Sequence, residues 1–300
     1  MSTPDWRSEY PFASHFVDAP SGWRMHYVDE GPRDAAPLLF VHGNPTWSFY
    51  WRHMIMGFRD TFRCVAPDHV GMGLSERPDQ DGPWHRLEGR ITDLCHLVER
   101  LDLRDLTVVV HDWGGAIGLG MAGRMPERIA RLVITNTGAF PSTDMPIRIA
   151  ACRLPVVGPL AVRGLNGFAG AALHMATEKG LPPIAKAGLL APYGNWGARI
   201  AIQRFVEDIP MDAAHPTWAT LKGVEANLAR LAHLPVLLDW GERDWCFTPK
   251  FRATFQRHFP DATVIRHEDC GHYLCEDARS ELLTEVRTFL AANPGPQATA

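Results

Sequence analysis

The stretch VVVHDWGG, residues 108–115, decides the fold of this chain. Three consecutive valines are typical of a buried strand, and Gly114 and Gly115 lead into a segment, AIGL, that favours a helix. A sharp turn between a strand and a helix makes the residue at the turn project from the top of the sheet. That residue is Asp112. The stretch therefore predicts a reactive carboxylate at the end of a buried strand.

Apolar segments that favour strands alternate with helical segments along most of the chain. These segments cover residues 37–43, 62–70, 106–112, 130–138, 235–244 and 262–272, and residues 14–30 favour an opening hairpin that turns at Ser21 and Gly22. The alternation predicts an α/β fold with a mostly parallel sheet and helices on both faces. Ligands bind such sheets at the carboxyl ends of the strands.

The pattern changes between residues 141 and 215 to helical segments rich in Ala, Gly, Pro and Leu. We expect a helical cap there, inserted into a core made of residues 1–140 and 216–292, with residues 293–300 as a flexible tail. Charged residues such as Arg148, Arg153 and Arg163 interrupt the cap well short of the ~20 apolar residues of a transmembrane helix. An apolar cap favours an apolar substrate.

The composition excludes several classes of function. The formal net charge is −4 and no run of lysine or arginine occurs, so we expect no nucleic-acid partner. The first residues lack the basic and apolar regions of a signal peptide, and the six cysteines show no framework spacing, which favours a cytoplasmic protein. Cys270, His272 and Cys275 lie near one another, but no second cluster completes a zinc site. We expect neither a metal nor a cofactor.

Side chains suited to catalysis recur where the predicted strands end. Asp112, Asp244 and His272 occur in the order nucleophile, acid and base. Each alone would be ordinary, because an aspartate at the end of a strand often caps the next helix. The three together favour a catalytic triad, and Asn44 and Trp113 stand at strand ends as well.

Over nearly its whole length, the chain resembles an α/β-hydrolase of the haloalkane dehalogenase group. The motifs that carry the resemblance are HGNPTWSFYWR (42–52), PDHVGMGLS (67–75), HDWGG (111–115), GERD (241–244) and CGHY (270–273). The resemblance implies an α/β-hydrolase fold with an eight-stranded sheet and an inserted helical cap. It also implies that Asp112 is the nucleophile and His272 the base.

In this group, the acid of the triad follows either the sixth or the seventh strand. The residues after the presumed sixth strand, Asn136 and Thr137, cannot be anionic, whereas Asp244 follows the seventh. The resemblance therefore assigns the acid to Asp244.

The resemblance also assigns a pair of residues to the leaving group. Asn44 and Trp113 match the pair found in the third branch of the group, and their side-chain N–H groups can donate to a departing halide or oxyanion. Further candidates for the substrate pocket are Trp47, Phe140 and Phe168.

An aspartate nucleophile restricts the reaction. A carboxylate displaces a leaving group from saturated carbon and forms an alkyl ester, so the substrate is expected to be a halide, an epoxide or a strained lactone. The cap stretches 163–173 and 192–210 resemble the β-lactone decarboxylases of bacterial olefin biosynthesis. This resemblance implies decarboxylation of long-chain cis-3,4-dialkyl β-lactones to cis-alkenes and carbon dioxide.

Three alternatives stay open. A haloalkane dehalogenase would hydrolyse the ester on Asp112 with water that His272 activates. An epoxide hydrolase usually has two lid tyrosines, and only Tyr193 lies in the predicted cap. A non-enzymatic relative would not need the whole triad. A water-insoluble substrate also favours an assembly with other enzymes of hydrocarbon biosynthesis, or a membrane surface.

Overall fold

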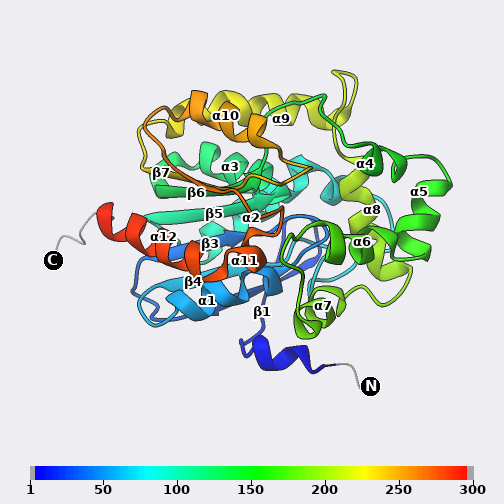
Figure 1. Ribbon diagram of the computed structural model, residues 1–300, viewed down its shortest axis with the longest axis horizontal. Helices are drawn as coiled ribbons and strands as arrows, with labels where there is room; N and C mark the ends of the chain where they lie inside the picture. Colours follow the sequence, from blue (N-terminus) through cyan, green and yellow to red (C-terminus); the bar gives the residue numbers. More distant parts are fainter. Residues whose placement is uncertain (1–3, 296–300) are drawn as a thin grey trace.

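A single eight-stranded sheet forms the centre of the computed structural model, which describes residues 4–295 (Figure 1). The strands lie in the order β1-β2-β4-β3-β5-β6-β7-β8. Their bounds are β1 (His15–Asp18), β2 (Arg24–Glu30), β3 (Pro37–Val41), β4 (Arg63–Pro67), β5 (Leu106–Asp112), β6 (Ile129–Thr137), β7 (Val236–Gly241) and β8 (Thr263–His267). Only the pairs β1–β2 and β2–β4 are antiparallel, so the predicted mostly parallel α/β-hydrolase sheet is confirmed.

Helices cover the two faces of the sheet in separate layers (Figure 1). One layer contains α2 (Leu87–Arg100), α3 (Trp113–Arg124), α9 (Pro216–Asn227) and α10 (Pro249–His258), and the other contains α1 (Arg52–Phe58), α11 (Leu274–Asp277) and α12 (Arg279–Ala292). Short 3-10 helices occur at η1 (Trp6–Glu9), η2 (Ser48–Trp51), η3 (Pro83–His85), η4 (Pro126–Arg128), η6 (Gly197–Arg199) and η7 (Leu228–Leu231). Because both faces are covered, β5 is buried along its whole length, which explains its run of valines.

The cap helices are inserted between β6 and β7, and they lie on the right in Figure 1. They are α4 (Ile147–Ala151), α5 (Val157–Pro159), the π-helical turn η5 (Leu160–Gly164), α6 (Gly167–Met175), α7 (Pro183–Leu190) and α8 (Ile200–Glu207). Among the described residues, no helix combines the length and the apolar character needed to cross a bilayer. The predicted tail begins at residue 293, and its last residues, 296–300, lie outside the described part of the chain.

Candidate active site

The turn between β5 and α3 holds Asp112 in an uncommon backbone conformation. Its φ angle is 52°, a left-handed value that costs a non-glycine residue about 1–3 kcal/mol and persists only where the surroundings impose it. Two close approaches impose it here. A Cβ on Gly43 would overlap the Asp112 carboxylate, and a Cβ on Gly114 would overlap the carbonyl oxygen of Val41. The Thr137 hydroxyl also donates to the Asp112 carbonyl oxygen, so the turn is fixed from several sides.

The three residues of the predicted triad lie together at the carboxyl ends of the strands. His272, in the loop after β8, has its Nε2 atom 3.6 Å from Oδ2 of Asp112. Its Nδ1 atom lies 2.8 Å from Oδ2 of Asp244, which follows β7. A carboxylate only accepts hydrogen bonds, so Nδ1 carries the proton and Nε2 faces Asp112. The geometry places the Asp112 carboxylate beside an imidazole that Asp244 orients, an arrangement suited to the predicted triad.

The carboxylate of Asp244 accepts hydrogen bonds from other donors besides His272. The backbone N–H groups of Cys246 and Phe247 donate to its Oδ1 over 2.7 and 3.1 Å. The Asn136 amide donates to its Oδ2 over 3.0 Å, and the Asn136 oxygen accepts from the N–H of Gly241. Asn136 lies at the end of β6, one of the two positions that the resemblance allows for the acid, and here it donates to Asp244 after the neighbouring strand β7. Sequence reasoning did not foresee this role.

Burial and charge shift the pKa values of both Asp112 and His272. Burial raises the pKa of Asp112, and the nearby His272 and the backbone N–H groups of Trp113 and Asn44 offset this increase only in part. Burial also lowers the pKa of His272, but the charge and hydrogen bond of Asp244 and the charge of Asp112 outweigh it, so the net pKa is raised. The raised pKa of His272 favours a protonated imidazole next to Asp112.

Asn44 and Trp113 flank Asp112. The backbone N–H of Asn44 donates to Oδ1 of Asp112 over 2.5 Å. The Asn44 amide donates to the carbonyl oxygen of Ile202 in the cap, and its own oxygen is buried without a partner among residues 4–295. The Trp113 ring packs on Phe205 with 5.5 Å between centroids. Both residues line the cavity that contains Asp112, where their side chains can donate to a departing anion.

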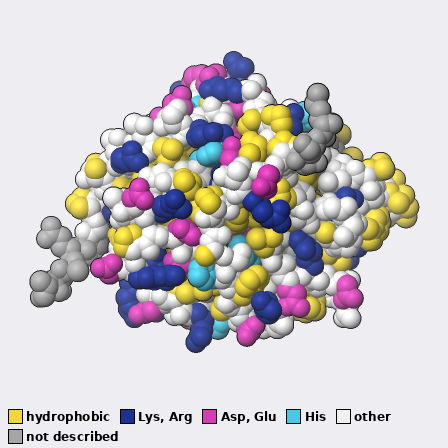
Figure 2. Space-filling model, turned by 90° about the horizontal axis from the view of Figure 1, so that it is seen from below, with side chains coloured by type: hydrophobic (Ala, Val, Ile, Leu, Met, Phe, Trp, Pro, Cys, Tyr) yellow, Lys and Arg dark blue, Asp and Glu magenta, His cyan; other side chains and the backbone are white. Residues whose placement is uncertain are grey.

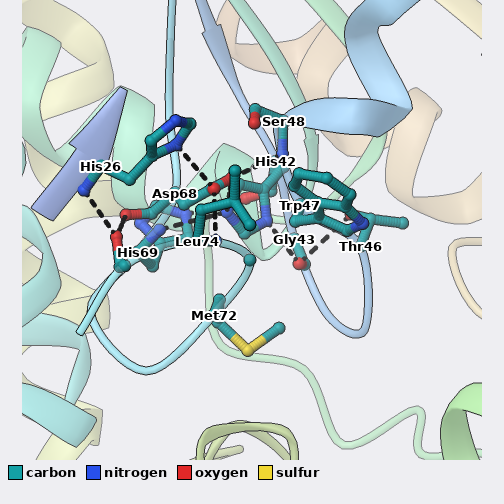
Figure 3. A network of polar contacts seen from close by, with 12 residues as sticks. His26, His42, Gly43, Thr46, Trp47, Ser48, Asp68, His69, Met72 and Leu74 are labelled. Atoms are coloured by element: carbon teal, nitrogen blue, oxygen red, sulfur yellow. Dashed lines mark hydrogen bonds and ion pairs between the residues drawn. The ribbon is translucent and has the colours of Figure 1, made fainter. Parts of the chain in front are cut away.

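A buried network around Asp68 anchors the loop that carries Asn44 (Figure 3). Asp68 accepts from the backbone N–H groups of Ser48 and Leu74 over 2.7 and 2.8 Å, and from Nδ1 of His26 over 2.9 Å. Its side chain is fully buried, so these hydrogen bonds replace the water that the carboxylate has lost. The network joins the motifs at residues 42–52 and 67–75, which explains why both contain polar residues inside the core.

Two apolar cavities meet at Asp112. They share Asn44, Asp112, Ile149, Phe168 and Cys246. The first cavity continues between α3, α8 and α9, where its lining includes Trp113, Ala116, Phe140, Val206, Ile209, Leu221 and Phe251. The second cavity continues along α6, where its lining includes Gly167, Ala171, Ala172, Met175, Trp245, His272 and Tyr273. Phe140 lines the first cavity and Phe168 lines both, and their contact with substrate stays a prediction.

Trp47 does not line either cavity, and its prediction as a pocket residue is wrong. Its indole is fully buried and packs against Trp6 and Phe49 with 5.4 and 5.5 Å between centroids. Its Nε1 donates to the carbonyl oxygen of Gly188 in α7 over 3.0 Å. Trp47 therefore holds the cap against the N-terminal segment. Tyr193, the tyrosine of the cap, is also absent from both linings and donates to the carbonyl oxygen of Thr46.

The sheet, the elbow and the triad define an enzyme of the α/β-hydrolase fold, and residues 36–154 match the family model of that description. The chain belongs to the family that contains β-lactone decarboxylases and haloalkane dehalogenases, as the motifs predict. It is 40% identical to a cis-3-alkyl-4-alkyloxetan-2-one decarboxylase of Shewanella oneidensis, over 93% of this chain and 89% of that protein. A decarboxylase of the same name from Xanthomonas campestris is 39% identical over 95% of this chain and 98% of that protein.

The chain is less similar in sequence to haloalkane dehalogenases than to the decarboxylases, but its structure is close to that of a dehalogenase. Haloalkane dehalogenase 2 of Mycobacterium tuberculosis is 33% identical, over 95% of this chain and 96% of that protein. The crystal structure of haloalkane dehalogenase DbeA from Bradyrhizobium elkani superposes with a TM-score of 0.85 at 26% identity, over 94% of this chain and 98% of that chain.

Proposed function

We propose that this protein converts cis-3,4-dialkyl β-lactones into cis-alkenes and carbon dioxide, with Asp112 as the nucleophile. The observation that carries the proposal is the meeting of two apolar cavities at Asp112. A 3,4-dialkyl lactone has alkyl groups on two adjacent ring carbons, so its chains leave the reacting centre separately. Each cavity can receive one of them, whereas a primary haloalkane has a single chain. The identity to the two decarboxylases supports the same reaction.

Ring opening is the first step. An oxygen of Asp112 attacks C4, the ring carbon that carries the ring oxygen, and the C4–O bond breaks as the new ester bond forms. The ring oxygen leaves as part of a free carboxylate, which Asn44 and Trp113 receive with their N–H groups. In-line attack inverts the configuration at C4, and relief of ring strain favours the step.

Fragmentation is the second step. The bond between C2 and C3 breaks, its electron pair forms the C3=C4 double bond, and the C4–O bond to Asp112 breaks. Carbon dioxide leaves and the Asp112 carboxylate is regenerated, so neither water nor a proton is consumed. The mainly apolar lining favours this step because a buried carboxylate is costly and carbon dioxide is neutral. Inversion followed by anti fragmentation converts a cis-lactone into a cis-alkene.

His272 acts through its charge in this sequence of steps. Its raised pKa favours the imidazolium, which stands 3.6 Å from Oδ2 of Asp112. The positive charge stabilises Asp112 as the leaving group of the second step, and Asp244 holds the ring in place. In a dehalogenase, the same imidazole would instead take a proton from water. The two reactions therefore need the same triad in different protonation states.

The proposed product places the enzyme in the formation of hydrocarbons, and we propose the cytoplasm as its location. All six cysteines lie in the described part of the chain and are free thiols, which supports a reducing compartment. The enzymes that form the lactone ring are the natural candidates for protein partners, because the intermediate has little solubility in water.

Substrate turnover tests the proposal. The purified enzyme is incubated with a long-chain cis-3,4-dialkyl β-lactone and, separately, with 1-bromobutane, and Asp112→Ala serves as the control. We expect cis-alkene by NMR and little bromide release, with both activities lost in the control. Fast bromide release with no alkene would assign the protein to the dehalogenases. A trans-alkene would refute the proposed order of inversion and anti fragmentation.

A further inference from the structure

Exposed apolar side chains gather on the cap. Within residues 4–295, nine large hydrophobic side chains are exposed, and seven of these lie in the cap: Ile147, Leu154, Val156, Val157, Leu160, Leu165 and Trp196. We call these seven residues the cap patch. Figure 2 shows yellow side chains gathered at the edge of the molecule that corresponds to the side of α5 in Figure 1. Soluble monomers rarely expose apolar groups together in this way, unless they bind another surface.

The segment that carries most of the cap patch is positively charged. Residues 145–176 contain Arg148, Arg153 and Arg163 and no aspartate, glutamate or lysine, although the whole chain has a net charge of −4. None of these arginines forms an ion pair with a carboxylate in the described part of the chain. Their charge is therefore available to a partner outside the molecule.

The acidic residues that border this segment already have cationic partners. Asp144 pairs with Lys250 at 3.2 Å and Glu178 with Arg243 at 3.3 Å. Glu207 pairs with Arg204. The acids around the cap patch are thus neutralised locally, so Arg148, Arg153 and Arg163 dominate the charge beside it.

The arginines of residues 145–176 and the apolar residues of the cap patch lie side by side. The Arg163 guanidinium lies 4.4 Å from the ring centroid of Trp196, which is 44% exposed. Ile147 is 86% exposed and precedes Arg148 and Ile149, which line the second cavity. The patch therefore borders the cavity that leads to Asp112. Tryptophan next to arginine is a combination that suits the boundary between hydrocarbon and lipid headgroups.

We propose that the cap patch docks on an anionic lipid surface. The apolar side chains would enter the hydrocarbon boundary, and the arginines would contact the negative headgroups. A second copy of the chain fits less well, because a symmetric dimer would bring the same unpaired arginines together. Docking does not depend on the proposed reaction. If that reaction is correct, docking places the second cavity beside the phase in which a lactone with two long chains dissolves.

Sedimentation with lipid vesicles tests this proposal on the full chain. The vesicles contain phosphatidylcholine alone or phosphatidylcholine mixed with phosphatidylglycerol. We expect the protein to sediment with the anionic vesicles and to be released by salt. Arg153→Gln is expected to weaken binding about fivefold. Leu165→Glu and Ile147→Glu are expected to weaken it further, whereas Phe16→Glu and Met56→Glu, at exposed apolar positions outside the cap, leave it unchanged.

The thermal unfolding curve of each variant is measured first to show that the variant is folded. We expect Leu165→Glu and Ile147→Glu to fold, because Leu165 and Ile147 are 83% and 86% exposed. Equal sedimentation with both kinds of vesicle, or equal effects of the cap variants and the controls, would overturn the proposal. Light scattering then measures whether the protein is a monomer or a dimer. A dimer that Leu165→Glu dissociates would assign the patch to a second copy, and the lipid proposal would be wrong.

Discussion

Replacement of Ala172 by leucine tests whether the second cavity holds one alkyl chain of the substrate. Ala172 lines only that cavity, and the larger side chain adds about three carbon atoms to it, which displace about three methylene groups of the substrate. Each methylene that loses its burial costs ~0.8 kcal/mol. The transition state therefore loses about 2.4 kcal/mol, which corresponds to a decrease of about sixtyfold in kcat/KM.

Ala116→Leu makes the matched change in the first cavity, where Ala116 is part of the lining. The assay uses two lactones, one with octyl at C3 and methyl at C4 and the other with the reverse arrangement. Both give the same alkene, so one chromatographic method measures both rates. Each variant should discriminate about sixtyfold against one isomer, and the two variants should discriminate against opposite isomers. If both variants penalised the same isomer, or neither changed the ratio, the assignment of one chain to each cavity would be refuted.

Three further predictions concern protons and oxygen atoms. Because burial raises the pKa of Asp112 and the nucleophile must be ionised, kcat/KM should fall with decreasing pH at a value above the ordinary carboxyl range. A profile that stays flat down to that range would contradict this assignment. After turnover of lactone in H₂¹⁸O, mass spectrometry should find no label in the peptide that contains Asp112, whereas labelled Asp112 would show that water hydrolyses the ester. Burial and the charge of Asp239 raise the pKa of Glu285 to about 7, so the fold loses stability as pH rises toward that value. Glu285→Gln should reduce this loss, seen as a higher melting temperature than the wild type above neutral pH; an unchanged pH dependence would count against the effect of burial and of the Asp239 charge on Glu285.

Most strands of the fold are predictable from the sequence, because the sheet imposes a local pattern on it. β5 and its neighbours are covered on both faces, and this burial requires the uninterrupted apolar runs that the sequence displays. The elbow is equally local, since Asp112 and Gly114 are only two positions apart. The opening hairpin follows from its turn, where Gly22 has a φ of 85°.

The sequence pattern could not predict contacts between distant segments. Asn136 meets Asp244 across 108 positions, and only the parallel pairing of β6 with β7 brings them together. Trp47 stands near Asn44 in the sequence, but its side chain points toward the N-terminal segment, because neighbouring residues in a loop need not face the same way. The two cavities likewise depend on how α6 and α8 lie over the sheet, which no single segment specifies.

One oxygen atom of Asp244 accepts hydrogen bonds from two side chains, and this arrangement allows the acid to change its position. Oδ2 of Asp244 accepts from both Asn136 and His272, so the two strand ends offer a carboxylate and an amide to the same small volume. An exchange of the two residue types, Asn136→Asp together with Asp244→Asn, would leave one acid and one amide there without moving the backbone. The resemblance implies that the acid of this group follows either the sixth or the seventh strand, and the ends of β6 and β7 meet at this location. A pair of substitutions would then be enough to exchange the acid between the two strands, with Asp112 and His272 left in place.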